Sequence, residues 1–205
     1  RSLKKHLGVT ILTGTRVEGI EPGDDAVLAT WTDARGKAGS GTFDALLVAV
    51  GRAPNIEDLG LEAAGVRLSE GRVAVDAMYN TSVPGVRAIG DLVATPWLAH
   101  VAHHEALIAV DDIAGLSPHP LDADRIPFCI YSQPEYARVG LTEAEAVARG
   151  RDVKAATFPF SALAKGLIEG GGEGAVKLVA DAGTGELLGL HIIGPRATEL
   201  VMEGT

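Results

Sequence analysis

The clearest periodic pattern in the sequence follows Thr95, where apolar residues recur every three or four positions, as on one face of an α-helix. The apolar positions are Ala102, Ala106, Ala109, Val110 and Ile113, and the residues that fall mostly off this stripe are His103, His104, Asp111 and Asp112. Thr95 and Pro96 are typical of a helix N-cap and of the first helical position, where the missing N–H of proline costs nothing. We therefore predict a helix that begins near Trp97.

Residues 86–91 precede this helix and are typical of a short buried strand that ends in Gly90 and Asp91. A carboxylate at the end of such a strand is well placed to accept hydrogen bonds from the hydroxyl groups of a ligand. A strand, a Gly-Asp pair, a turn and a helix together predict a ligand-binding corner. The simpler alternative is an ordinary turn at the end of a strand.

A second apolar run, residues 44–50, is continuous rather than alternating, which is typical of a strand buried on both faces of a parallel sheet. This run ends at Gly51. A glycine at that position allows a ligand to approach the backbone closely, at the edge where open α/β sheets bind nucleotides. A plain turn from strand to loop is again the alternative.

Short strands separated by turns are expected on both sides of these segments. A β-meander with a hairpin turn at 33–36 is predicted from residues 8–14, 15–20, 26–32 and 37–43. After a proline-rich linker at 116–121, the expected strands are 126–131, 136–139, 153–158, 175–181 and 186–194. Thr142 and Glu145 have the spacing of a capping box and open a helix that ends at Gly150, and residues 196–203 are expected to form a closing helix.

Composition and charge narrow the classes of partner. The 205 residues are 46% hydrophobic and 22% charged, with a net charge of -9 and a pI near 5.1. This balance is that of a globular protein, and it argues against nucleic acid or an anionic membrane surface as the main partner. No apolar run reaches the length of a membrane span and no signal peptide is visible, so we expect a cytoplasmic protein with no membrane partner.

Candidate thiols and metal ligands are few. Cys129 is the single cysteine, which excludes an intramolecular disulfide, a Cys-x-x-Cys site and a thiolate zinc cluster within this sequence. It lies in an apolar run, where a buried inert thiol is expected. His100 and His104 are one helical turn apart and can supply two metal ligands, but no third ligand is obvious. An exposed polar helix face is the favoured interpretation, and we predict no metal site.

The segment VRAIGDLVATPWLAHVAHHEA resembles the second FAD-binding motif of the flavoprotein disulfide reductases, most closely that of the dihydrolipoyl dehydrogenases. LLVAVGRAPN resembles the end of the NAD(P)-binding domain in the same family, and residues 133–143, 158–160 and 189–195 resemble its dimerisation domain. The resemblance therefore covers nearly the whole sequence. It implies an α/β nucleotide-binding portion followed by an α+β dimerisation domain. The implied parts are the end of the NAD(P)-binding domain in 1–55, the second FAD-binding segment in 56–117 and a truncated dimerisation domain in 118–205.

This resemblance also implies FAD and NAD as cofactors. Asp91 matches the aspartate that hydrogen-bonds the ribityl chain of FAD, and Gly51 matches a glycine that lines the dinucleotide site. The residues implied beside the flavin ring are Trp97, Leu98, Ala99 and His100. The physics of a helix N-terminus agrees, because its unpaired N–H groups and positive dipole end stabilise the negative charge that builds on a flavin upon reduction.

The resemblance implies an enzyme that oxidises dihydrolipoamide with NAD, so the expected partners are a lipoyl group and a second copy of the chain, paired through the C-terminal domain. In that family the phosphate loops and the redox cysteine pair lie N-terminal to the matched region, and the catalytic histidine and glutamate lie C-terminal to it. We therefore assign no catalytic residue, and His191 does not match that base. Since helix ends are suggested at residues 2–7 and at Thr205, we expect a piece of a longer protein that is inactive alone.

Two alternatives stay open. Glutathione reductases and mercuric reductases share the motifs around Gly51, Gly90 and Asp91 and the dimerisation domain, so another member of the family, with another substrate, is one alternative. The choice of NAD or NADP is not determined by these residues. A non-catalytic module that binds a partner through its dimerisation surface is the other.

Overall fold

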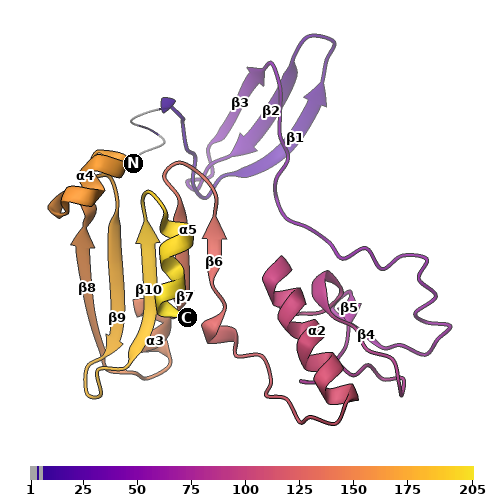
Figure 1. Cartoon of the computed structure of the whole chain (residues 1–205). Coiled ribbons are helices and arrows are strands. Elements are labelled where there is room, and N and C mark those ends of the chain that lie inside the picture. The colour runs from indigo at the N-terminus through magenta and orange to yellow at the C-terminus, as the bar shows by residue number, and fades with distance from the viewer. Residues whose placement is uncertain (1–3, 5–6) are drawn as a thin grey trace. The chain divides into compact units, whose positions relative to one another are not determined.

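The computed structural model describes residue 4 and residues 7–205 and divides the chain into two compact units, Arg1–Ala53 and Pro54–Thr205 (Figure 1). Most of the helix end expected at residues 2–7 lies outside the described residues. The second unit contains a helix with its flanking loops and, after them, a larger sheet.

The first unit is built around an antiparallel meander of β1 (Arg16–Pro22), β2 (Val27–Thr32) and β3 (Ala38–Phe43), in that spatial order. The carboxylate of Asp33 accepts hydrogen bonds from the backbone N–H groups of Arg35 and Lys37, at 2.8 and 2.9 Å, and so closes the turn between β2 and β3. The predicted meander is confirmed for these three strands. Residues 8–14 do not form the additional strand that we expected.

Residues 44–50 are the largest departure from the sequence prediction. They form no strand, and the side chains of Leu47 and Val50 are 91% and 92% exposed. A strand that is buried on both faces requires neighbouring strands and covering helices to supply its hydrogen bonds and its contacts. No strand of the described part of the chain pairs with this run, so its apolar composition alone does not order it.

The second unit begins with loops that surround one long helix, α2 (Ala99–Ile113). These loops contain the two-residue antiparallel pair β4 (Leu68–Ser69) and β5 (Arg72–Val73). The strand expected at 86–91 is a single bridge between Asn80 and Arg87, followed by the 3-10 turn η1 (Gly90–Leu92). These loops bury a small cluster of Val66, Val73, Ala88 and Val93.

A five-stranded antiparallel sheet forms the rest of the second unit (Figure 1). Its strands are β6 (Phe128–Ile130), β7 (Tyr136–Gly140), β8 (Val153–Pro159), β9 (Ala175–Asp181) and β10 (Leu187–Ile193), in the spatial order β6-β7-β10-β9-β8. All five were expected from the sequence, with ends that differ by at most two residues. The antiparallel pairing confirms the expected change of character after the linker.

Short helices connect and cover these strands. The capping box that opens α3 (Glu143–Ala148) is confirmed, because Thr142 and Glu145 each accept a hydrogen bond from the other's backbone N–H. The closing helix is present as α5 (Ala197–Leu200) and the 3-10 turn η4 (Val201–Gly204). The described residues also form η2 (Ala123–Arg125), η3 (Phe160–Ala162) and α4 (Ala164–Gly170), none of which was expected.

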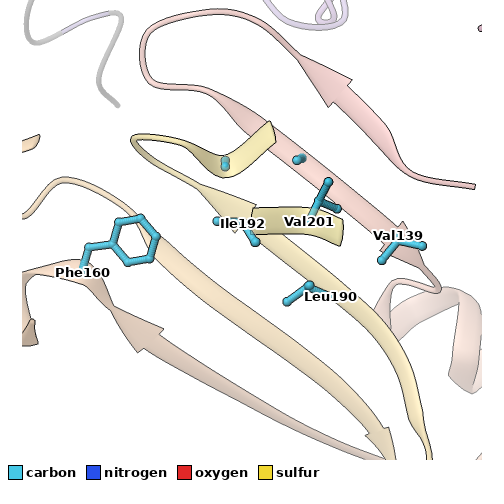
Figure 2. Packing of buried hydrophobic residues seen from close by; sticks show 7 residues of the cluster. Val139, Phe160, Leu190, Ile192 and Val201 are labelled. Carbon is cyan, nitrogen blue, oxygen red and sulfur yellow. The ribbon is translucent and has the colours of Figure 1, made fainter. Parts of the chain in front are cut away.

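One face of the sheet carries the principal core. Figure 2 shows Val201 of η4 above Val139 and Leu190, which come from the adjacent strands β7 and β10. Each of these three side chains is at most 6% exposed. The full cluster consists of Ala137, Val139, Phe160, Leu190, Ile192, Ala197 and Val201.

Candidate functional site

The candidate site lies where the loop of residues 87–93 runs along α2. Arg87 forms an ion pair with Asp112 near the C-terminal end of this helix, and both side chains are largely buried. Three residues later, Gly90 lies beside Ala102, since a methyl group built on Gly90 would be 3.5 Å from the Cβ of Ala102. The loop therefore runs antiparallel to the helix, toward its N-terminus. This direction places Asp91, the next residue, near the first turns of α2.

Glu105 fastens this loop to the helix. Its side chain is fully buried, and its Oε2 accepts a hydrogen bond of 2.6 Å from the backbone N–H of Gly90. Gly90 has a φ of +72°, a conformation that glycine adopts without strain. The sequence interpretation missed Glu105 because it placed the buried stripe of α2 one position away.

The buried stripe of α2 is Val101, Glu105, Ile108 and Ala109. Of the positions expected to be buried, Ala109 is buried and Ala102 and Ala106 are half-buried, whereas Val110 and Ile113 are 60% and 65% exposed. The buried positions 101, 105, 108 and 109 also follow helical spacing, and they include one carboxyl group. A helical stripe drawn through positions 101, 105, 108 and 109 would have placed Glu105 among the buried residues.

Beside Glu105 lies Tyr79, which is 4% exposed and packs against Ile108 and Ala109. Burial, together with the negative charge of Glu105, raises the pKa of Tyr79 to about 12. The phenol therefore stays protonated at neutral pH. The other residues packed around Tyr79 are apolar.

The N-terminus of α2 differs from the prediction. The helix begins at Ala99, two residues after the expected start, and its N-cap is Leu98, which makes no side-chain cap hydrogen bond. The indole N–H of Trp97 donates to the carbonyl of Val93 at 3.0 Å, which folds the intervening residues into a separate turn. The hydroxyl of Thr95 is buried in this turn without a hydrogen-bond partner in the described structure, so the Thr95 cap was wrong.

An arginine that the sequence interpretation did not single out supports the Trp97 ring. The guanidinium carbon of Arg72 lies 5.2 Å from the ring centroid, within the range of a cation–π contact. The Nε of Arg72 is buried and makes no hydrogen bond within the described part of the chain. Arg72 therefore brings a positive charge to the side of the helix N-terminus.

The structure brings five of the six predicted cofactor-binding residues together on one continuous loop and helix start. They are Asp91, Trp97, Leu98, Ala99 and His100. Asp91 is half-buried, and His100 is exposed with its Nε2 2.9 Å from the carbonyl of Pro127. Gly51, the sixth, lies in the first unit, where it is exposed and has a φ of +133°.

The histidines and the thiol of Cys129 were the candidates for metal binding and thiol chemistry. Within the described residues, no group of three histidine, cysteine or acidic side chains is arranged to hold a metal ion, and His100 and His104 stay a pair. The Cys129 thiol is half-buried, and desolvation raises its pKa above the ordinary value. A raised pKa lowers the fraction of reactive thiolate, as expected for an inert thiol.

Two family profiles together match most of the chain. One, described as pyridine nucleotide-disulphide oxidoreductase, matches residues 1–106. The other, described as the dimerisation domain of the same proteins, matches residues 126–205. The chain belongs to the pyridine nucleotide-disulphide oxidoreductase family. This membership confirms the predicted fold class of a nucleotide-binding portion followed by a dimerisation domain.

Two curated relatives from bacteria are both named dihydrolipoyl dehydrogenase. The chain is 42% identical to a dihydrolipoyl dehydrogenase of Bacillus subtilis over 98% of its own length and 43% of that protein. It is 44% identical to a dihydrolipoyl dehydrogenase of Thermus scotoductus over 100% of its length and 44% of that protein. The chain thus spans less than half of the curated relatives that it matches.

Solved structures agree with this assignment. LpdA from Mycobacterium tuberculosis superposes on 92% of the chain with a TM-score of 0.82 and 26% identity, and the matched region is 40% of that protein. The HOCl-induced flavoprotein disulfide reductase RclA from Escherichia coli, solved with Cu(II), gives a TM-score of 0.82 at 25% identity over 92% of this chain and 42% of that one.

Among the described residues, none of the helices has the length and apolar character to cross a bilayer.

Proposed function

We propose that this chain is the part of an FAD- and NAD-dependent disulfide oxidoreductase, acting on dihydrolipoamide, that contacts the flavin and forms the dimer. The observation that carries the proposal is that the loop of residues 87–91 is tied to α2 at Arg87 and Gly90, so that Asp91 follows a residue beside the first turns of this helix. The family membership and the shared name of the relatives support the same activity.

The residues present fit a flavin dinucleotide. Asp91 offers a half-buried carboxylate that accepts hydrogen bonds from hydroxyl groups such as those of a ribityl chain. The first N–H groups of α2 have no acceptor within the helix, and Leu98 supplies no side-chain cap that would compete for them. Two buried polar atoms have no hydrogen-bond partner in the described structure: the hydroxyl of Thr95 within the Trp97 turn, and the Nε of Arg72, whose guanidinium group contacts the Trp97 ring.

Each of these groups has a definite role in the proposal. When bound, FAD supplies a two-electron carrier between the nicotinamide and a disulfide. Asp91 holds the hydroxylated chain of the cofactor, and the N–H groups at Ala99 and His100 stabilise negative charge at the end of the helix. Arg72 fixes the plane of Trp97, which shields that end of the site from water.

Gly51 and the five-stranded sheet extend the proposal to NAD and to a second copy of the chain. Gly51 is exposed and its positive φ is unfavourable for other residues, as expected where a dinucleotide approaches the backbone. The dimerisation profile over residues 126–205 coincides with the sheet, which is the surface proposed for an isologous dimer. A lipoyl group is the proposed substrate.

The test replaces the matching segment of the Bacillus subtilis relative by this chain and measures the flavin that the purified chimera retains after dialysis. Asp91→Ala removes a charge-assisted hydrogen bond, so FAD should bind roughly 10- to 100-fold more weakly. Asp124→Ala is the matched control, because it removes an exposed carboxylate that pairs with Arg149 and should leave flavin content unchanged. Equal flavin retention in the Asp91 variant and the parent chimera would reject the site.

A further inference from the structure

Only one of the two carboxyl oxygens of the buried Glu105 makes a hydrogen bond in the described structure. Its Oε2 accepts from the Gly90 N–H, but its Oε1 is buried with no hydrogen-bond partner in the described structure. No cation pairs with it there either, since the nearby Arg87 pairs with Asp112. Burying a carboxyl group without a cation is costly. A residue selected for stability alone at this buried phase of α2 would be apolar, like Ile108 one turn further along.

The hydrogen bond from Gly90 fixes the one residue that precedes Asp91. Gly90 has a positive φ and no side chain, so nothing except its backbone contacts sets the direction of the chain at this point. Arg87 anchors the start of the loop near the end of α2 that lies away from the site. Glu105 is therefore a contact through which α2 holds the residue directly before Asp91.

We propose that Glu105 is a positioning residue of the flavin site, whose buried carboxyl group sets the position of Asp91 relative to the N-terminus of α2. This inference rests on the proposed function. Asp91 and the helix N–H groups must act on one cofactor, so an error in their relative position weakens both contacts together. Glu105 touches neither the cofactor nor the substrate in this account, and it acts through the Gly90 N–H.

The test uses Glu105→Leu in the chimera. This substitution introduces an apolar side chain of similar volume and leaves the Gly90 N–H buried without an acceptor. The FAD dissociation constant of the folded variant should rise roughly 5- to 100-fold. Ile108→Ala is the matched control, since it creates a cavity on the same buried face without touching Gly90. It should lower the melting temperature while the FAD dissociation constant stays within about twofold.

Glu105→Gln retains an acceptor oxygen at the same reach and keeps the test decisive if the leucine variant fails to fold. It should rescue flavin binding to within a few-fold of the parent, and the amide proton of Gly90 should remain protected from exchange. Normal FAD affinity in a folded Glu105→Leu protein would overturn the positioning role, as would a folded Gln variant with a protected Gly90 amide that has lost FAD. Because Asp91→Ala is measured in parallel, loss of FAD there with no effect at Glu105 would overturn this inference alone. No effect at Asp91 would overturn the flavin site and this inference together.

Discussion

The carboxyl group of Glu105 and the guanidinium group of Arg72 belong to the candidate site but were not predicted from the sequence. The sequence identified Asp91 and the start of the following helix, because a Gly-Asp pair before an amphipathic run is a local signal. Glu105 was missed because the apolar stripe is rich in alanine, which fits buried and exposed positions alike, and the stripe was therefore assigned one position away. Arg72 was missed for a different reason, since its contact with Trp97 joins residues 25 positions apart, and no periodic pattern reports such a contact.

Glu135 allows a prediction about pH. Its Oε2 accepts hydrogen bonds from the backbone N–H and the hydroxyl of Thr198, at 3.0 and 2.7 Å, and these bonds hold its pKa below the ordinary value of 4.5. A carboxyl group whose pKa is lowered by folding stabilises the protein above its unfolded pKa, and this contribution disappears as pH falls through the folded pKa. Glu135→Gln should therefore lower the free energy of unfolding by roughly 1–3 kcal/mol at pH 7.

The difference between Glu135→Gln and the parent chain should shrink as the pH falls from 4.5 through the lowered pKa of folded Glu135, because its carboxyl group becomes neutral there, like the amide. Urea unfolding monitored by circular dichroism at a series of pH values measures it. Glu62→Gln, on an exposed turn, is the control and should change the unfolding free energy by less than about 0.5 kcal/mol at every pH. A Glu135 effect that is independent of pH would contradict the assigned role of the carboxylate.

Elements that depend on local chemistry were predicted well, and elements that depend on distant neighbours were not. The β2–β3 turn at Asp33 and the capping box at Thr142 are both set by side chains within a few residues, and both are present. Residues 44–50 have the composition of a buried strand but no pairing strand in the described chain, so they remain exposed. Helix α4 was overlooked because glycines occur within it and directly after it, which lowers helix propensity.

The pairing of β7 with β10 depends on a glycine that can be tested against a matched one. Gly140 at the end of β7 and Gly150 after α3 have nearly equal φ values of +77° and +76°. A methyl group on Gly140 would lie 2.3 Å from the Leu188 carbonyl oxygen, whereas nothing lies within 4 Å of one on Gly150. Both substitutions by alanine pay the left-handed backbone cost of about 1–2 kcal/mol.

Gly140→Ala should therefore destabilise the chain by roughly 1–3 kcal/mol more than Gly150→Ala, because the strands must separate to admit the methyl group. Guanidinium unfolding of the two variants and the parent measures the two losses directly. Equal losses would show that the backbone conformation, and not the close approach of β7 to the Leu188 carbonyl, sets the requirement for glycine at Gly140.

The domain organisation of the chain is taken from the two family profiles and not from its sheet topology. The two profiles assign a nucleotide-binding portion to residues 1–106 and a dimerisation domain to 126–205, but the boundaries at 55 and 117 stay predictions. The chain matches about 43% of the length of a full relative. Residues 44–50 carry the apolar composition of a buried strand and are largely exposed within the part of the chain that the structure describes.

The last prediction concerns activity and substrate. The chain alone should not reduce lipoamide with NADH, because a dithiol–disulfide exchange needs two cysteines and this sequence holds only Cys129. The chimera with the Bacillus subtilis relative should be active, and Cys129→Ser should leave its turnover nearly unchanged.

The kcat/KM of the chimera should be higher for dihydrolipoamide with NAD than for glutathione disulfide with NADPH. A lipoyl arm needs an apolar tunnel, whereas the carboxylates of glutathione need cationic partners, and this chain carries a net charge of -9. A preference for glutathione disulfide would overturn the proposed substrate and leave the flavin site standing, whereas lipoamide reduction by the chain alone would contradict the requirement for a second cysteine.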